Sequence, residues 1–235
     1  KIQRDGDMYT LTDNVYDEIV VERDNIVLDG AGYTIQGSGG LGSGVGIYLY
    51  HRSNVTIKNT KIKQFYNGIG LYESSKITIS RNNLTNNFCG VDVTYSSNNL
   101  ISGNNITANN YHGVVLDDSS NNGISGNNIT NNGYMGILLA RTSGNTISKN
   151  NITNNYHGIE LYDSANYNSI FENIIANNGV GVWVHTSSNN VIYHNNFVDN
   201  TGHAWAYHYE SLNVWDDGYP SGGNYWSDYT GVDLY

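Results

Sequence analysis

A repeat of 22 or 23 residues constrains the fold of this chain more than any other feature of its sequence. Glycines open successive copies at intervals of 22, 23, 23 and 22 residues, at Gly68, Gly90, Gly113, Gly136 and Gly158. Each copy continues with apolar residues at the first and third positions, a polar turn, and an asparagine-rich segment with isolated apolar residues. A period in this range is typical of a solenoid, in which each repeat forms one coil and packs on its neighbours.

Three apolar strands recur in seven coils, which open at these five glycines and at Gly46 and Gly181. The residues one and three places after each glycine are apolar, and this period of two predicts a strand with one buried face. A second apolar position falls at Ile57, Ile79, Ile101, Ile124, Ile147, Ile170 and Ile192. A third falls at Ile62, Leu84, Ile106, Ile129, Ile152, Ile174 and Phe197. Three strands per coil, stacked at about 4.8 Å per coil, predict an all-β parallel β-helix with an Ile/Val/Leu core.

We expect a single domain in three parts. Residues 1–45 form an N-terminal coil whose glycine-rich segment, Gly37 to Gly44, overhangs the solenoid as a loop. Residues 46–212 hold the β-helix coils. Residues 213–235 form a cap, because a solenoid otherwise exposes its last coil and an unpaired strand edge. The aromatic residues expected to cover the apolar end are Trp205, Trp215, Tyr225 and Trp226.

The charge and the cysteine content exclude several classes of protein. Lys and Arg number 11 against 21 Asp and Glu, a formal net charge of −10, which argues against a protein that tracks nucleic-acid phosphates. Cys89 is the only cysteine, so we expect no intrachain disulfide and no cysteine-based metal site. No apolar run approaches the roughly 18 residues of a membrane span. The chain opens at Lys1 without a signal peptide, as expected for a mature or excised fragment of a secreted protein.

Asparagines recur in the same register as the apolar positions. One column is predicted at Asn87, Asn109, Asn132, Asn155, Asn177 and Asn200. Stacked identical amides pass hydrogen bonds from coil to coil and pair the backbone of the polar turn, which is a structural role. A second, outward column is predicted at Asn83, Asn105, Asn128, Asn151, Asn173 and Asn196. Several of these open N-x-Thr sequons, and both glycosylation and the ordinary use of Asn and Thr on an exposed strand edge stay open. The candidate glycosylation sites are Asn54, Asn83, Asn105, Asn128 and Asn151.

Two segments outside the repeats add a family resemblance. One is Ile26-Val-Leu-Asp-Gly-Ala-Gly-Tyr-Thr-Ile35, and the other is Trp215-Asp-Asp-Gly-Tyr-Pro-Ser-Gly-Gly-Asn-Tyr-Trp-Ser-Asp-Tyr229. With the repeats, they make nearly the whole chain resemble the NosD-like proteins, most closely those of secreted and surface-layer proteins of methanogenic archaea. The resemblance implies a right-handed, single-stranded parallel β-helix. The name-giving members assist copper-site assembly, and the wider group includes carbohydrate-binding proteins, sugar hydrolases and uronan epimerases.

The outward positions of the strand after each opening glycine hold the densest cluster of ionisable residues in the coils. Paired carboxylates about 5–10 Å apart could act as acid and base in glycoside cleavage. Family analogy offers a second route, in which aspartates hold calcium while an arginine abstracts a proton. The candidates are Asp117, Asp118, Arg141, Glu160 and Asp163. The negative net charge suits a polyuronate substrate poorly, and isolated charges on a solvated face are the commoner explanation.

Aromatic residues on the same face favour binding without chemistry. Rings on a rigid sheet beside hydroxyls and carboxylates can stack on sugar rings at small entropic cost. Tyrosine also simply suits an exposed strand, so the structural explanation stays open. The ligand-binding candidates are Tyr48, Tyr50, Tyr72, Tyr95, Tyr162, Trp183 and His185.

The sequence offers candidate ligands for two metals, calcium and copper. Calcium suits oxygen ligands from a glycine-rich loop, and its candidate ligands in the cap are Asp216, Asp217 and Asp228. Copper has weaker support, because His112 and His157 lie two coils apart, about 10 Å, and Cys89 offers little thiol for Cu(I). The remaining histidines near the C-terminal end have no known ligand spacing: His185, His194, His203 and His208.

The preferred hypothesis is a non-catalytic, extracellular module of a cell-surface or envelope protein. Its role is structural or adhesive, and its expected partners are envelope glycans or neighbouring surface proteins. The alternatives are a polysaccharide-active enzyme (lyase, hydrolase or epimerase) on this outer face, a self-assembling fibre subunit, and a copper-handling periplasmic protein. No nucleic-acid partner, no direct membrane span and no cofactor other than calcium are expected.

Overall fold

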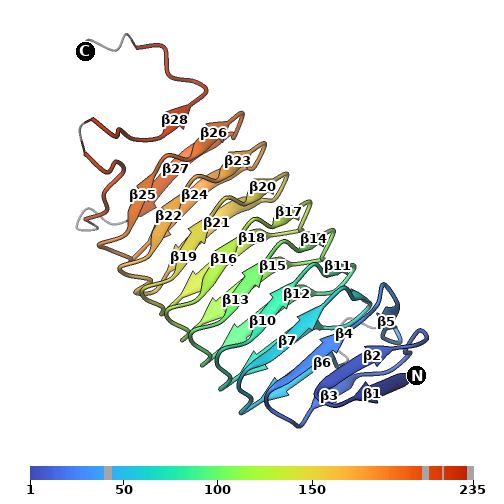
Figure 1. Ribbon diagram of the computed structural model, residues 1–235. Helices are drawn as coiled ribbons and strands as arrows, with labels where there is room; N and C mark the ends of the chain where they lie inside the picture. The colour runs from blue at the N-terminus through green and yellow to red at the C-terminus, as the bar shows by residue number, and fades with distance from the viewer. Residues whose placement is uncertain (40–43, 208–211, 219, 232–235) are drawn as a thin grey trace.

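The computed structural model describes residues 1–39, 44–207, 212–218 and 220–231. In this part of the chain all regular structure is β-strand, and the strands wind into a right-handed parallel β-helix, as predicted (Figure 1). The coils follow one another along a single axis from the N-terminal to the C-terminal end. The described residues form no helix long and apolar enough to cross a membrane.

The described strands form three sheets, named here A, B and C, and each coil contributes one strand to each sheet. Sheet A contains β1 (Ile2–Asp5), β2 (Met8–Leu11), β4 (Ile26–Asp29), β7 (Val55–Lys58), β10 (Thr78–Ser80), β13 (Leu100–Ser102), β16 (Gly123–Ser125), β19 (Thr146–Ser148), β22 (Ser169–Phe171) and β25 (Val191–Tyr193). Sheet B contains β5 (Thr34–Gln36), β8 (Lys61–Lys63), β11 (Asn83–Thr85), β14 (Asn105–Thr107), β17 (Asn128–Thr130), β20 (Asn151–Thr153), β23 (Ile174–Ala176), β26 (Asn196–Val198) and β28 (Tyr225–Trp226). Sheet C contains β3 (Ile19–Val21), β6 (Val45–Tyr50), β9 (Asn67–Tyr72), β12 (Cys89–Thr94), β15 (His112–Asp117), β18 (Met135–Ala140), β21 (His157–Tyr162), β24 (Val180–His185) and β27 (Gly202–Tyr207).

The apolar core follows directly from the register of these strands. Ile79 pairs with Ile57 and Ile101 on its two neighbours in sheet A, and the apolar residues of sheets B and C stack in the same way. The side chains of these columns are fully buried. Fully burying an aliphatic side chain stabilises a protein by about 1.5–3 kcal/mol, so the repeated apolar positions account for the fold.

The prediction is wrong by one residue in the coil that begins at Gly158. Ile175, not Ile174, occupies the core position, and Ile174 is 47% exposed. Asn178, not Asn177, continues the first asparagine column. The extra residue of this 23-residue coil lies in the turn after sheet C, where Asp163 and Ser164 both have positive φ. Glycine spacing alone does not reveal which turn holds the insertion.

Close packing explains the glycine that opens each coil. A Cβ added to Gly113 would lie 2.5 Å from the carbonyl oxygen of Gly136 and 2.8 Å from the Ile129 side chain. The other opening glycines meet the same kind of contact with the next coil. A side chain at this position therefore forces adjacent coils apart.

Buried asparagine ladders join the coils at their turns. The first predicted ladder is confirmed except at one position, where Asn178 takes the place of the predicted Asn177. It runs through Asn87, Asn109, Asn132, Asn155, Asn178 and Asn200. A second buried ladder runs through Asn82, Asn104, Asn127, Asn150, Asn173, Asn195 and Asn224. A third runs through Asn99, Asn122, Asn145, Asn168, Asn190 and Asn213. Asn173 therefore belongs to a buried ladder and not to the outward column in which it was predicted.

A single rung shows what these ladders do. The backbone N–H and the side-chain amide of Asn127 both donate to Oδ1 of Asn150, at 3.0 and 2.9 Å. The same side-chain amide donates to the carbonyl oxygen of Ile101 at 2.9 Å. Each asparagine thus satisfies backbone groups of two neighbouring coils that the turn would otherwise leave buried and unpaired.

The C-terminal end of the solenoid is covered by part of the predicted aromatic cap. Trp226 stacks on the buried Phe197 with ring centroids 4.4 Å apart, and Trp215 packs beside Trp226. Trp205 and Tyr225 are 54% and 58% exposed and do not cover the apolar end. The reason is their register, because Trp205 pairs with Trp183 on the outer face of sheet C and Tyr225 pairs with the outward Asn196.

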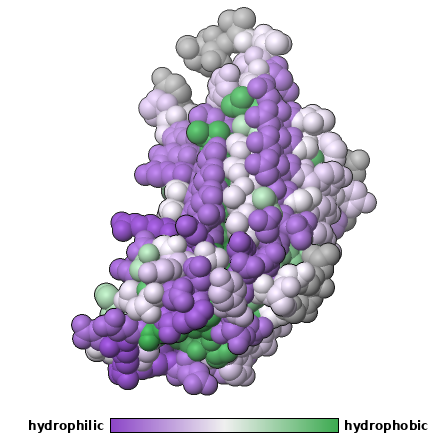
Figure 2. All heavy atoms as spheres, turned by 90° about the vertical axis from the view of Figure 1, so that its right-hand side faces the viewer, coloured by the Kyte–Doolittle hydropathy of each residue, from purple (hydrophilic) through white to green (hydrophobic). Residues whose placement is uncertain are grey.

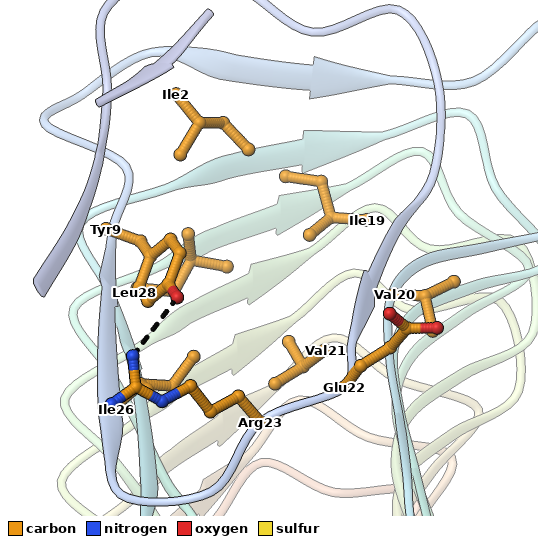
Figure 3. A pocket seen from close by; sticks show the side chains of 9 residues that line it. All are labelled: Ile2, Tyr9, Ile19, Val20, Val21, Glu22, Arg23, Ile26 and Leu28. Atoms are coloured by element: carbon orange, nitrogen blue, oxygen red, sulfur yellow. Dashed lines mark hydrogen bonds between the residues drawn. The ribbon is translucent and has the colours of Figure 1, made fainter. Parts of the chain in front are cut away.

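The N-terminal end is less complete. The hairpin of β1 and β2 extends sheet A, whereas β3 ends sheet C among the described strands. Between them lies a cavity of about 320 Å³, and Figure 3 shows Ile2, Ile19 and Leu28 on its walls. The Arg23 guanidinium approaches the Tyr9 hydroxyl at 3.5 Å across its mouth. The loop predicted from Gly37 to Gly44 includes residues 40–43, which lie outside the described residues.

Candidate functional site

The outer face of sheet C carries side chains in columns parallel to the solenoid axis. Figure 2, a view of one side of the molecule, shows hydrophilic residues aligned in such columns along its length. On sheet C the columns are defined by their position relative to the opening glycine. Residues two places before it form the ring column, Tyr66, Phe88, Tyr111, Tyr134 and Tyr156. Residues one place before it form the donor column, Asn67, Cys89, His112, Met135 and His157.

The ring column is a continuous aromatic stack that the sequence analysis missed. Its successive ring centroids are 4.7, 4.9, 5.0 and 5.4 Å apart, with interplanar angles of 12–20°. In the next coil the equivalent residue is Gly179, so the stack ends and Tyr156 is 59% exposed. The sequence signal was present, because an aromatic residue stands two places before each of five opening glycines.

The end of the ring column forms a notch. Its volume is about 210 Å³, and its lining residues are Tyr156, His157, Gly179, Val180, Thr201 and Trp205. Gly179 contributes no ring to the stack, and a Cβ built there would lie 2.6 Å from the Tyr156 carbonyl oxygen, so the close approach of the two backbones requires glycine. The next rung of an aromatic stack is therefore open to a ligand.

A buried histidine–glutamate pair lies beside this notch. His157 Nδ1 is 3.2 Å from Glu160 Oε2, and both side chains are almost fully buried. The Trp183 ring meets the His157 ring edge-on at 4.5 Å. Glu160 is thus separated from the other carboxylates with which it was grouped as a catalytic candidate. Its oxygen is committed to His157 and is screened from a ligand at the surface.

The remaining catalytic candidates come together around Arg141. The guanidinium contacts Asp117, Asp118 at 3.1 Å and Asp163 at 3.5 Å. The hydrogen bond to Asp118 and the charge of Asp117 raise the pKa of Arg141, which disfavours a role as proton acceptor. Burial raises the pKa of Asp117, although the Arg141 charge opposes this effect. All three carboxylates are engaged by one cation, which is the arrangement of a turn-stabilising network.

The predicted ligand-binding aromatics fall into two groups. Tyr48, Tyr50, Tyr72 and Tyr95 form one near the N-terminal end, with successive centroids 5.4–6.5 Å apart. Tyr162 and His185 stack at 5.1 Å in the other, and Trp183 lies 6.5 Å from His185. The Arg141 network occupies the coils between them. Only the second group adjoins the notch, through Trp183 and its contact with Trp205 at 6.4 Å.

The donor column places a thiol, an imidazole and a thioether on three successive strands. Cys89 pairs in register with His112, and Met135 occupies the same position on the next strand. Burial raises the pKa of Cys89 to about 12 and lowers the pKa of His112 to about 4. His112 Nδ1 is buried and has no hydrogen-bond partner in the described part of the chain. This alignment, too, could have been found by comparing the residues before each opening glycine.

The aspartates predicted as calcium ligands lie apart. Asp216 accepts the backbone N–H of Gly218, and Asp217 pairs with His194 at 3.4 Å. Asp228 pairs with His203 at 3.1 Å. Among the described residues no three His, Cys, Asp or Glu side chains group as a metal site. His208 lies outside the described residues.

The candidate glycosylation sites lie on the outer surface. Asn105, Asn128 and Asn151 each donate a side-chain amide hydrogen to the preceding asparagine of their column, beginning at Asn83, at 2.8–3.0 Å. Asn54 donates in the same way to Asn25. Modification of these residues stays a prediction.

The model of the family described as periplasmic copper-binding protein (NosD) matches residues 18–231. The chain belongs to the NosD family. Its fold resembles that of the periplasmic alginate epimerase AlgG, with a TM-score of 0.72 and 20% identity over 85% of this chain and 50% of that one. It also resembles a C387A mutant of DFA-IIIase from Arthrobacter chlorophenolicus A6 in complex with DFA-III, with a TM-score of 0.65 and 13% identity over 86% and 61% of the two chains.

At these identities the structural likeness shows the fold alone, and this chain spans about half the length of the structures it matches. No curated protein sequence matches the chain significantly. The family description implies copper, and the donor column holds ligand types that suit it, but Cys89 and Met135 lie two strands, about 10 Å, apart, which is too far for one ion. Thiolate, thioether and imidazole are ligands that suit Cu(I), and His112 Nδ1 is a buried nitrogen without a hydrogen-bond partner among the described residues.

Proposed function

We propose that this chain is a non-catalytic extracellular module that binds glycans on the outer face of sheet C. The observation that carries the proposal is the notch at the end of the ring column, where the face of Tyr156 is open because Gly179 replaces the next ring. Sugars present C–H faces that pack on aromatic rings, and a rigid ring pays little entropy on binding.

The surroundings of the notch favour binding over bond cleavage. Glu160 is buried against His157, and the Asp117, Asp118 and Asp163 carboxylates are engaged by Arg141. Glycoside hydrolysis needs an acid and a second carboxylate that both reach the scissile bond. The net charge of −10 makes neutral or amino sugars better ligands than uronates.

The proposed location is the cell envelope or the extracellular surface. The NosD family is described as periplasmic, and so is the alginate epimerase. Both descriptions support a location outside the cytoplasm. The regular stack of coils suits a structural or adhesive role, because it presents the binding surface on a stiff support. Neighbouring surface proteins are further proposed partners.

A glycan array followed by calorimetry and a turnover assay tests the proposal. We expect binding of a neutral or amino-sugar oligosaccharide without turnover, weakened at least about tenfold by Tyr156→Ala, or about 1.4 kcal/mol. The matched control is Tyr167→Ala, since Tyr167 is similarly exposed, at 66% against 59% for Tyr156, but lies in the turn between sheets C and A. Equal glycan affinity for Tyr156→Ala and wild type would contradict the proposed site. Turnover of a polysaccharide that is lost in Asp117→Asn or Arg141→Ala would show that the chain is an enzyme and not a non-catalytic module.

A further inference from the structure

The outer face of sheet B carries a regular array of polar side chains, on a different face from the proposed glycan site. Four successive strands, β11, β14, β17 and β20, each have the pattern Asn-apolar-Thr. The apolar residue lies in the core, and the strand pairing aligns the asparagines in one column and the threonines in a second. The members of this amide–hydroxyl array are Asn83, Thr85, Asn105, Thr107, Asn128, Thr130, Asn151 and Thr153. All are at least partly exposed except Thr130, at 8%.

Hydrogen bonds within the array hold its side chains in place. Asn105, Asn128 and Asn151 each donate to Oδ1 of the preceding asparagine at 2.8–3.0 Å, and the Thr107 and Thr130 hydroxyls lie 3.2 Å apart. An amide has two N–H donors and two acceptor lone pairs. An amide inside the column gives one donor and one lone pair to its neighbours, which leaves one of each for water. The array is thus ordered before a ligand arrives, which lowers the entropic cost of binding.

The array repeats in two directions. Neighbouring strands lie about 4.8 Å apart, and residues two places apart on one strand lie about 6.6 Å apart. Hexagonal ice presents oxygen atoms on its prism faces at close to the same two spacings. Sheet B forms the right-hand side of the solenoid in Figure 1, and Figure 2 shows that side with its polar residues in straight columns. Liquid water hydrates any polar surface, whereas a regular array bonds to many positions of a lattice at once.

The array is also uncharged, although the chain has a formal net charge of −10. Ice excludes ions, so a neutral face complements its surface, whereas a charged side chain keeps its own hydration water. The array ends at Lys61 and Lys63 of β8 on one side and at Ile174 and Ala176 of β23 on the other. We propose that the amide–hydroxyl array binds the surface of ice crystals. This site is independent of the proposed glycan site, which lies on sheet C.

The test measures ice recrystallisation and retention in slowly grown ice, using the purified chain from a host that adds no N-glycans. We expect the wild type to slow recrystallisation and to be retained in ice, both beyond serum albumin at the same concentration. Thr107→Lys places a charge inside the array and should raise the lowest inhibitory concentration at least about tenfold. Ser102→Lys is the matched control, because Ser102 is a half-buried outward residue of the same coil on sheet A. It should leave the inhibitory concentration unchanged.

Thermal denaturation establishes that each variant is folded before its activity on ice is compared. A wild type no more active than serum albumin, or equal losses in Thr107→Lys and Ser102→Lys, overturns the proposal. Retention on crystalline chitin or cellulose through this face, without retention in ice, assigns the array to a polysaccharide and also overturns it.

Two further measurements separate this site from the alternatives. Tyr156→Ala should bind ice as the wild type does while losing glycan, and Thr107→Lys should do the reverse, so failure of either site is seen separately. The asparagines of the array also open the predicted N-x-Thr sequons. Glycans found on Asn105 or Asn128 by mass spectrometry of the chain from its natural source would cover the array and overturn the proposal.

Discussion

The buried asparagine ladders and the outer columns of sheet C use the same in-register stacking in different ways. Each ladder repeats one residue type through its coils, and its amides bond mainly to one another and to backbone. The donor column changes residue at almost every coil, and the ring column stops at Gly179. Uniform buried columns hold the solenoid together, whereas the outer columns are where ligands are proposed to bind.

The largest expected effect is the loss of one ladder rung. Asn127→Ala removes the acceptor of the Asn104 N–H and the donor to the Ile101 carbonyl, both buried. Each unsatisfied buried group costs about 1–3 kcal/mol, so we expect the free energy of unfolding to fall by about 3 kcal/mol. Chemical denaturation followed by circular dichroism measures it.

Asn128→Ala is the matched control for this rung. Asn128 is adjacent in sequence, but its side chain is exposed on the outward column of sheet B. Exposed substitutions usually change stability by less than about 0.5 kcal/mol. Similar losses for both variants would remove the distinction between buried and outer columns.

A second prediction concerns a ring inside the outer column. Tyr111→Ala removes stacking on Phe88 and Tyr134, at 4.9 and 5.0 Å. Aromatic pairs contribute about 0.5–1.5 kcal/mol each, so we expect a loss of about 2 kcal/mol in the free energy of unfolding. Glycan affinity, measured by calorimetry on the same variant, should stay at the wild-type value because Tyr156 is two rungs of the column away. A parallel loss of glycan binding would show that the whole column, and not its end, is the binding surface.

The smallest expected effect is the pH dependence caused by Asp92. Burial raises the pKa of its carboxyl, although hydrogen bonds from Thr94 and Asn67 partly oppose the change. The folded state therefore holds this proton more tightly than the unfolded state, and stability falls as pH rises through and above the ordinary carboxyl range. Asp92→Asn removes this fall.

The free energy of unfolding of both chains at pH 4 and pH 7 checks the prediction. The variant should gain stability relative to wild type on going from pH 4 to pH 7, by less than Asn127→Ala loses. Parallel values for the two chains would show that the outer carboxylate is solvated in the same way in the folded and unfolded states.

The sequence predicted the fold well because each repeated position holds a residue type with a single structural role. Apolar residues fill the core, and glycines stand where adjacent coils pack closely. The apolar positions and opening glycines leave little choice, and the core follows them everywhere except at Ile174. That slip arose because an extra residue at Asp163–Ser164 gives the same 23-residue glycine spacing as an extra residue in a different turn. Local backbone conformation, not the period, decides which turn takes the extra residue.

The candidate site was harder to predict because it depends on side-chain direction. Arg141 and its three aspartates were grouped correctly, since they share one turn in neighbouring coils. Glu160 was misplaced among them because the pairing with His157 depends on both side chains turning toward each other. The ring and donor columns were not predicted, because the apolar period of two that marks the strand starts after each glycine, whereas these residues stand before it.

The direction of the hydrogen bonds has a mechanical consequence. Ladder amides and strand backbones both bond along the solenoid axis, from one coil to the next. A pull along that axis loads the coil–coil contacts in series, so the chain extends by losing one coil at a time. A pull across the axis instead shares the load among many contacts at once. A solenoid of this design is expected to resist force across its axis better than force along it.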